Sequence, residues 1–352
     1  MMNHCTSKST VSRRFSGQSV GSIENHPLVV EKDASACYLL WAAFLLLVVN
    51  GVVLPAQSPP VPTGQMIDIG ERRLHLDCIG SGSPTVLVQP GAGSFAVEWT
   101  LVQRIVAPRY RICVYDRAGY AWSDHGPVDE DIAQTVDDLH LLIRRGQIET
   151  PAIFVCQSLG CVFARAYQRR FPEQVAGLVF VDATHDEGIT LVLHGERRAI
   201  SLISRVDLPG AYGEYKRSLP PLKPGGSSTP PFDRLPQKER GIRLWAFTKM
   251  VHEMGWLPDS LATAESWREE FTALRSQRLT QAHPLKDLPL VVLERSERPD
   301  PVWHKQQEEL AALSSAGTLI QVKDSGHMIH LEKPDAVAQA IFHVAARIAS
   351  RR

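Results

Sequence analysis

The stretch that most constrains the fold runs from Ile153 to Cys161, where a short apolar segment ends on a serine and continues directly into a helical pattern. The order of strand, sharp turn and helix places Ser158 at the apex of the turn. In such a turn the serine hydroxyl projects clear of the sheet, and the amides that open the helix point at whatever the hydroxyl attacks. The usual pattern is Gly-x-Ser-x-Gly, and Cys156 stands here in place of the first glycine. The segment predicts a nucleophilic serine in an incomplete motif, with an ordinary strand-to-helix turn as the alternative.

Strand and helix patterns alternate from Gln65 onward, which favours a mostly parallel sheet covered by helices on both faces. Two short alternating segments, 67–69 and 73–78, are separated by a turn at Gly70-Glu71. They predict an antiparallel hairpin at the start of the sheet. Buried strands are then expected over 85–88, 111–115 and 175–181.

Two loops follow expected strands on the way to Ser158. Residues 89–93 contain two glycines, which let the backbone approach a ligand closely, so the amide of Ala92 is a candidate donor to an oxyanion. A plain strand-to-helix turn is the alternative for this loop. In the second loop, Asp116 and Arg117 are expected to tie down the turn rather than to carry chemistry.

From about residue 65 to its end, the chain resembles the α/β-hydrolase superfamily, and most of all exported or membrane-anchored bacterial serine hydrolases of the esterase type. The resemblance rests on the serine turn, the glycine loop, the turn at Asp116 and the run Asp324-Ser325-Gly326-His327, in this order. The early strand Leu74 to Cys78, with its pattern Leu-His-Leu-x-Cys, adds to it. The resemblance covers about four-fifths of the chain.

The family resemblance implies an α/β fold with an eight-stranded, mostly parallel sheet in a domain over 65–352, with a helical lid inserted after the sixth strand, over about 186–285. Within the lid, residues 209–235 are rich in Pro, Gly and Ser and are expected to be loop. Residues 242–274 carry large apolar side chains at partly helical spacing. Packing against the main domain is one interpretation of these side chains, but some of them are expected to line an apolar pocket over the active site. The large apolar residues of this segment are Trp245, Phe247, Met250, Met254, Trp256 and Trp267.

A serine hydroxyl needs a base to take its proton and a carboxylate to hold that base in the right tautomer. In this fold the order along the chain is serine, acid, histidine, so the base should lie far downstream. His327 fits, because it follows an expected strand over 318–322 and precedes a helix that starts near Lys333. His330 and His185 are more distant candidates.

The acid is harder to place. Many family members carry it after the seventh strand, but no aspartate occupies the expected position in this chain, which falls near Arg298. Others carry it at the end of the sixth strand, where Asp182 stands, although an aspartate there is also a common capping or turn residue. Asp182 is therefore the first candidate, and Glu297 and Asp300 are the alternatives.

The expected reaction is acyl transfer to Ser158, with His327 as base and with the oxyanion held by the amides of Ala92 and Leu159. The substrate is then a small-molecule ester with an apolar acyl or aromatic group. A serine nucleophile disfavours dehalogenase and epoxide hydrolase chemistry, which need a carboxylate. Lyase, acyltransferase or carbon–carbon hydrolase chemistry and a non-catalytic binding protein of the same fold are the alternatives.

Neither a metal nor an organic cofactor is expected, because the histidines and cysteines lack ligand spacing. Cys78 and Cys113 fall in strands that are neighbours in the sheet of this fold. The resemblance therefore implies a cross-strand disulfide if the domain lies outside the cytoplasm, with two buried free thiols as the alternative. Cys156 and Cys161, which flank the serine, are expected to be small packing residues.

The segment before residue 65 predicts an attachment to a membrane or an export signal. Residues 1–36 are polar, without apolar periodicity, and predict disorder. Residues 37–54 carry no charge and predict a transmembrane helix or a cleaved signal sequence, with a buried core helix as the remaining alternative. Basic residues precede this segment and none follows until Arg72, so the large domain is expected outside the cytoplasm, anchored or secreted.

Residues 55–64 are rich in proline and are expected to be a linker. The formal net charge of the whole chain is zero, which gives no reason to expect a nucleic-acid partner.

Overall fold

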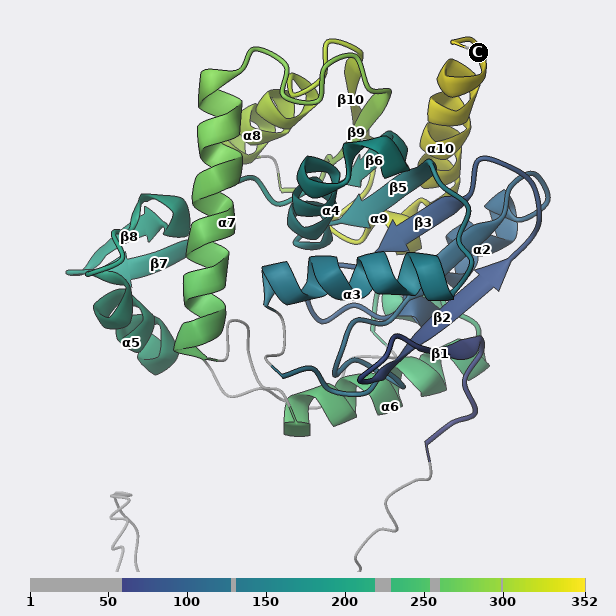
Figure 1. Cartoon of the computed structure of the whole chain (residues 1–352), viewed down its shortest axis with the longest axis horizontal. Helices are drawn as coiled ribbons and strands as arrows, with labels where there is room; N and C mark the ends of the chain where they lie inside the picture. The colour runs from purple at the N-terminus through teal and green to yellow at the C-terminus, as the bar shows by residue number, and fades with distance from the viewer. Residues whose placement is uncertain (1–58, 128–130, 219–228, 254–259, 299, 352) are drawn as a thin grey trace, which may run out of the picture. The chain divides into compact units, whose positions relative to one another are not determined.

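A sheet of eight strands forms the centre of the computed structural model, which describes residues 59–127, 131–218, 229–253, 260–298 and 300–351. The strand order is β1-β2-β4-β3-β5-β6-β9-β10 (Figure 1). The first strand pairs antiparallel with β2, and β2 pairs antiparallel with β4, while the other neighbours are parallel. The predicted mostly parallel sheet and its opening hairpin are confirmed. The strands are β1 (Gln65–Asp68), β2 (Arg73–Ile79), β3 (Val86–Gln89), β4 (Ile112–Tyr115), β5 (Ala152–Gln157), β6 (Val175–Val181), β9 (Leu290–Arg295) and β10 (Gly317–Val322).

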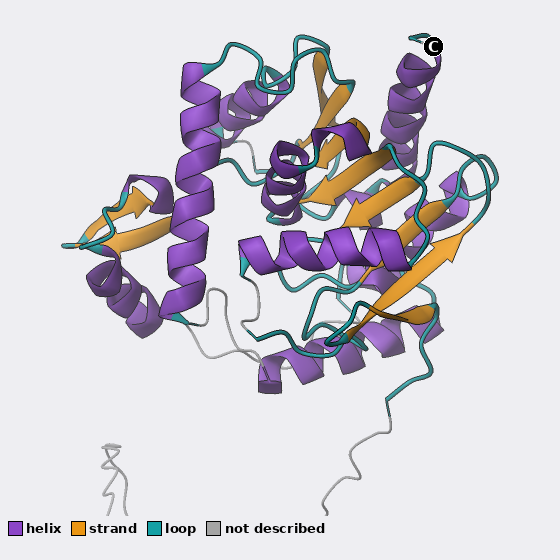
Figure 2. Cartoon of the chain, viewed as in Figure 1, coloured by secondary structure: helices purple, strands orange, loops and turns teal. Residues whose placement is uncertain are grey.

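Helices cover both faces of this sheet, as Figure 2 shows. Because successive side chains of a strand point to opposite faces, alternate residues of β5 belong to different cores. Ile153 and Val155 pack with α2 and α10, whereas Phe154 and Cys156 pack with α3 and α4. The helices are α2 (Thr100–Val106), α3 (Ile132–Arg145), α4 (Gly160–Arg170), α8 (Pro301–Ala311), α9 (Ile329–Glu332) and α10 (Pro334–Ala349).

The lid follows β6, as predicted, and it opens with a two-stranded hairpin that the sequence patterns did not predict. Leu191 and Leu193 alternate toward the core, and His194 and Gly195 both adopt positive φ, as a tight turn of this kind requires. The glycine after alternating leucines was the available signal. The lid elements are β7 (Thr190–Leu193), β8 (Glu196–Ala199), α5 (Leu208–Ser218), α6 (Gln237–Glu253) and α7 (Leu261–Thr280).

The expectation that residues 209–235 form a loop is wrong for the first part of this range, which belongs to α5. Pro209 occupies the second position of the helix, where its missing N–H group breaks no intrahelical hydrogen bond. Leu208 and Ala211 are buried, and Tyr212 packs against the main core, so apolar burial stabilises the helix. Residues 219–228 lie outside the described residues.

The predicted segments 1–36 and 37–54 lie outside the described residues, as do residues 55–58 of the linker. In the part of the chain that the structure describes, no helix is long and apolar enough to cross a membrane. The end of the linker is held against the domain, because the carbonyl of Pro60 accepts a hydrogen bond from the indole of Trp122 at 2.6 Å.

A disulfide joins Cys78 of β2 to Cys113 of β4. The two residues stand directly opposite each other in the antiparallel register of these strands. The cross-strand bond is therefore confirmed, and the alternative of two free thiols is wrong.

Candidate active site

β5 brings Ser158 to the carboxyl edge of the sheet, and α4 begins two residues later. Ser158 has a φ of 50°, which residues other than glycine rarely adopt. Its amide donates to the carbonyl of Val181, and its carbonyl accepts from the amides of Cys161 and Thr184, each at 3.1 Å. These contacts hold the serine in the predicted sharp turn between strand and helix.

Cys156, which stands where a glycine is usual, forms a disulfide with Cys161. The expectation that both are only packing residues is wrong. The turn brings their Cα atoms to 4.9 Å, within the range that a disulfide can span. Gly160 is the glycine that the turn still needs, because a Cβ atom there would lie 2.3 Å from the carbonyl oxygen of Gln89. The sulfur of Cys156 is thus accommodated by a covalent bond to the helix that follows the serine.

Asp182 directly follows β6, and its buried carboxylate accepts a hydrogen bond from Nδ1 of His327 at 2.5 Å. Asp182 also adopts positive φ, at 45°. Burial opposes its ionisation, but the hydrogen bonds and charges of His327 and Arg295 outweigh burial and hold the pKa of Asp182 below its usual value. His327 follows β10 with 42% of its side chain exposed. The structure therefore joins the first candidate for the base to the first candidate for the acid.

The two alternative acids have other contacts. Asp300 caps α8, since its carboxylate accepts from the amides of Val302 at 2.9 Å and Trp303 at 3.4 Å. The amide of Glu297 donates to the carbonyl of Ser325 at 2.9 Å. Among the described contacts, neither carboxylate is hydrogen-bonded to His327.

The two alternative bases are buried in places that do not suit the role. Burial lowers the pKa of His330 to about 3 and the pKa of His185 to about 4. The His330 ring stacks on Trp99 with ring centroids 4.5 Å apart. Nε2 of His185 lies 3.1 Å from the carboxylate of Glu309 and 3.7 Å from that of Asp186. Neither ring contacts the Asp182 carboxylate among the described residues.

Gln157 is a site residue that the sequence patterns did not reveal. Since Nδ1 of His327 donates to Asp182, Nε2 is left to accept, and Nε2 of Gln157 donates to it at 3.1 Å. A Cβ atom on Gly91 would lie 2.2 Å from Oε1 of Gln157, so this glycine makes room for the amide. Among the described residues, Oγ of Ser158 makes no hydrogen bond. The available signal was the position of Gln157, immediately before the serine at the end of a buried strand.

Hydrogen bonds from the turn at Asp116-Arg117 hold the loop that contains Ala92. The Arg117 guanidinium donates to the carbonyls of Pro90 and Gly91, at 2.6 and 2.9 Å. One carboxylate oxygen of Asp116 accepts from the amide of Ala96 at 2.8 Å. The expectation that these two side chains tie down the turn is confirmed.

The amides of Ala92 and Leu159 are the two predicted oxyanion donors. Leu159 directly follows the serine and precedes the first residue of α4, so its amide belongs to the N-terminal end of that helix. Within the described ranges, neither amide is hydrogen-bonded to a protein acceptor. Both amides are thus available to bind a ligand oxygen.

The lid helix α6 covers the Ala92 loop. A Cβ atom on Gly93 would lie 3.7 Å from the terminal methyl group of Met250. A buried ion pair between Arg243 and Glu98, at 2.7 Å, anchors the helix. Met250 therefore lies next to the Ala92 loop, and Trp245 packs against Trp122.

The other predicted lining residues differ from Met250. Trp267 of α7 is buried in the main core beside Phe271, so it packs rather than lines a pocket. Phe247 is partly buried in the apolar cluster under α6. Met254 and Trp256 lie outside the described residues.

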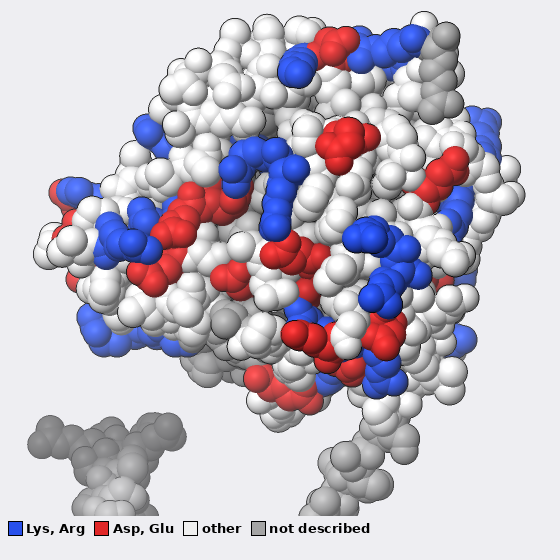
Figure 3. All heavy atoms as spheres, viewed as in Figure 1, with Lys and Arg blue, Asp and Glu red and all other residues white. Residues whose placement is uncertain are grey.

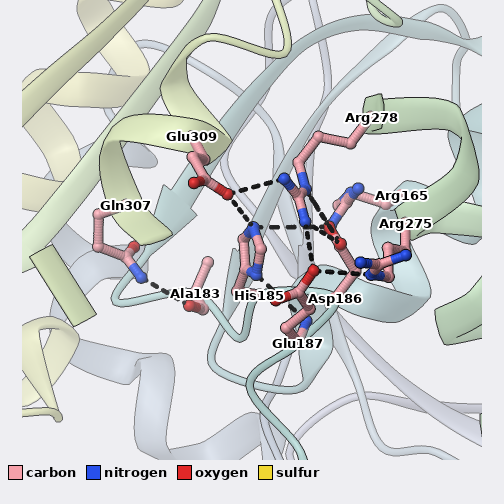
Figure 4. Close-up of polar contacts among 9 residues, drawn as sticks. All are labelled: Arg165, Ala183, His185, Asp186, Glu187, Arg275, Arg278, Gln307 and Glu309. Atoms are coloured by element: carbon pink, nitrogen blue, oxygen red, sulfur yellow. Dashed lines mark hydrogen bonds and ion pairs between the residues drawn. The ribbon is translucent and has the colours of Figure 1, made fainter. Parts of the chain in front are cut away.

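A second group of polar side chains follows Asp182 along the chain (Figure 4). Asp186 is buried and contacts Arg165 of α4 at 3.1 Å and Arg278 of α7 at 3.0 Å. Glu187 contacts the same Arg278 and also Arg275, at 3.0 and 2.7 Å. These five side chains, with His185 and Glu309, are called the Asp186 cluster below. The cluster fixes the segment after Asp182 to α4, the helix that follows Ser158, and to α7 of the lid.

On the face that Figure 3 shows, basic and acidic side chains are interspersed. This distribution accords with the zero formal net charge of the chain.

Comparisons with known proteins agree with this architecture. A family model described as alpha/beta hydrolase family matches residues 85–340. An AB hydrolase superfamily protein of Gibberella zeae is 23% identical over 292 residues, which cover 73% of this chain and 85% of that protein.

Two solved structures show a similar fold. An esterase from Thermogutta terrifontis has a TM-score of 0.53 at 19% identity and covers 79% of this chain and 94% of its own. A meta-cleavage product hydrolase from Pseudomonas fluorescens has a TM-score of 0.57 at 18% identity, with coverage of 81% and 98%. At these identities the likeness concerns the fold alone.

Proposed function

The chain belongs to the alpha/beta hydrolase family, and on this premise we propose that it is a serine hydrolase of carboxylic esters. In this proposal Ser158 is the nucleophile, His327 the base and Asp182 the acid. The observation that carries it is the 2.5 Å hydrogen bond from His327 to the buried Asp182, in a histidine that also contacts Gln157, the residue before a serine with positive φ. A base held by a carboxylate next to a strained serine is the arrangement that acyl transfer requires.

The proposed reaction moves one proton through His327. As Oγ of Ser158 attacks the ester carbonyl carbon, its proton passes to Nε2 of His327, and the amides of Ala92 and Leu159 bind the oxygen that becomes negative. The alcohol leaves with the proton from His327, and water repeats the cycle to release the acid. Before the first step, the Gln157 amide has to leave Nε2, because that atom accepts only one proton.

The proposed substrate is a small ester with an apolar acyl or aromatic group. Support comes from Met250 of α6, whose terminal methyl group would lie 3.7 Å from a Cβ atom on Gly93 in the Ala92 loop. Apolar walls with a few convergent polar groups are typical of small-molecule sites. Hydrolysis of a carbon–carbon bond is the second candidate, because the meta-cleavage product hydrolase shares the fold.

We also propose that the domain works outside the cytoplasm, anchored through residues 37–54 or secreted after cleavage of that segment. The support is two disulfides, Cys78–Cys113 and Cys156–Cys161, since such bonds persist in oxidising compartments.

Labelling with a fluorophosphonate tests the nucleophile. We expect the protein to be labelled once, and to hydrolyse p-nitrophenyl esters of several chain lengths. Ser158→Ala should abolish the label and lower kcat by about 10⁶-fold, because removal of the nucleophile disables the whole triad. A protein that takes no label, or a label that survives in Ser158→Ala, contradicts the proposal.

A further inference from the structure

The buried carboxylate of Asp182 is shared between a histidine and an arginine. Its Oδ2 atom lies 2.5 Å from Nδ1 of His327 and 2.7 Å from the guanidinium of Arg295. Its Oδ1 atom accepts from the backbone amide of Arg295 at 3.2 Å and from the indole of Trp303 at 2.9 Å. Whenever His327 is protonated, the single negative charge of Asp182 is therefore shared between two cations, the imidazolium of His327 and the guanidinium of Arg295.

The fold keeps Arg295 in this position. It is the last residue of β9, the parallel neighbour of β6, the strand that Asp182 directly follows. Its guanidinium lies 4.3 Å from the centre of the Trp303 ring, and only 20% of its side chain is exposed. Trp303 in turn meets the His327 ring edge-on, with the ring centroids 6.3 Å apart. The guanidinium is thus packed between an indole and the carboxylate rather than free in solvent.

We propose that Arg295 is a positioning residue that shares the charge of Asp182 and thereby extends the activity of the site to lower pH. The proposal rests on the function proposed above. A carboxylate beside a histidine stabilises the protonated ring. A second cation on the same oxygen weakens that stabilisation, so the ring loses its proton at lower pH and can act as a base there. The same sharing makes the imidazolium of the transition state less stable, which limits the maximal rate.

The other titratable groups around His327 do not have this effect. Glu332 of α9 accepts from the amide of Gly326 at 2.5 Å, and the carboxylate of Glu297 lies 3.6 Å from the position of a Cβ atom on Gly326. Both are acidic and favour the protonated ring. His330 has its pKa lowered to about 3 by burial and by the charge of His327, so it stays neutral over the working range. Among the described residues, Arg295 is the cation that contacts the acid of this pair.

Two matched substitutions separate charge from geometry. Arg295→Met removes the charge and keeps an unbranched side chain against Trp303, while Trp303→Phe removes a neutral donor from the same carboxylate. Full-length protein is assayed for kcat/KM against pH with a p-nitrophenyl ester. The titration of His327 is followed in parallel by NMR of ¹³C-labelled histidine, with the resonance assigned by its loss in His327→Gln.

For Arg295→Met, we expect the acid limb of the pH profile and the midpoint of the His327 titration to move to higher pH, because a positive charge next to the carboxylate is lost. Arg295→Lys keeps the charge and should leave both close to the wild-type positions. Trp303→Phe should lower kcat without moving the acid limb.

The proposal is overturned if the His327 midpoint in Arg295→Met equals that of the wild type. It is also overturned if Trp303→Phe moves the midpoint equally, because the effect would then come from geometry. If Arg295→Met does not fold, Arg295→Gln replaces it in the same measurements. The NMR titration needs no turnover, so it tests Arg295 even in a protein without esterase activity. Missing label at Ser158 contradicts only the proposed hydrolase function.

Discussion

Asp182 and Asp186 stand in the same segment after β6, and both are fully buried carboxylates whose pKa lies below the usual value despite the opposing effect of burial. Their partners differ. Asp182 faces His327, a half-exposed side chain that can gain and lose a proton, whereas Asp186 pairs with Arg165 and Arg278, which stay charged. Burial and a lowered pKa thus do not by themselves identify a catalytic carboxylate. The feature that distinguishes Asp182, and that supports its proposed role, is a titratable partner, His327, which contacts Gln157 next to the proposed nucleophile.

The contrast between Asp182 and Asp186 would fail most clearly if Asp182 had only a structural role. For Asp182→Asn we expect kcat to fall by about 10⁴-fold, because an amide cannot hold the base in the tautomer that accepts the serine proton. Steady-state kinetics on the p-nitrophenyl ester measures this effect, and a thermal melt checks the fold. A variant with wild-type kcat would remove Asp182 from the triad, and Glu297→Gln and Asp300→Asn would then be assayed for the acid.

Asp186→Asn should show the opposite pattern. We expect the free energy of unfolding to fall by about 3–5 kcal/mol, because Arg165 and Arg278 then lose the buried carboxylate that compensates their charge. Activity for each molecule that takes the fluorophosphonate label should stay near that of the wild type. Chemical denaturation and active-site titration give these two values. Unchanged stability together with a large loss of kcat would make the two carboxylates equivalent and would contradict the comparison.

The sequence predicted the elements with strong periodicity well. A local pattern of apolar residues was enough to predict three of them: the hairpin of β1 and β2, the strand before Ser158 and the buried strand before Asp182. The start of α5 was missed because Pro209 and nearby glycines suggest a loop, and only contacts with the distant core make the helix favourable. Local pattern cannot report such contacts.

The same limit explains which parts of the site were predicted. His327 and Asp182 were each recognisable from their motifs, but they lie 145 positions apart, so the sequence left Asp182, Glu297 and Asp300 open as the acid, and the contact that supports Asp182 appears only in the fold. Arg295 and Trp303 contact Asp182 from 113 and 121 residues away. No spacing rule brings them to one carboxylate. The Cys156–Cys161 bond could have been predicted from the sequence, because the sharp turn around Ser158 brings the start of the following helix back toward the end of the strand.

The smallest expected effect concerns the histidine of the Asp186 cluster. Burial lowers the pKa of His185 to about 4, while an unfolded chain protonates a histidine near pH 6.5. Between these values the unfolded state binds more protons, so the stability that neutral His185 permits is complete above pH 6.5 and is lost as the pH falls. From pH 7 to pH 5 this loss is about 2 kcal/mol.

Nδ1 of His185 accepts a hydrogen bond from the amide of Glu187 at 3.1 Å. In His185→Asn, the side-chain oxygen of the asparagine can accept this hydrogen bond in place of Nδ1, and it does not titrate. Denaturation at both pH values should therefore show a loss about 2 kcal/mol smaller in the variant than in the wild type. Equal losses would mean that His185 is protonated inside the Asp186 cluster. Asp186 would then have a titratable histidine beside it, as Asp182 has His327, and the contrast between the two carboxylates would fail.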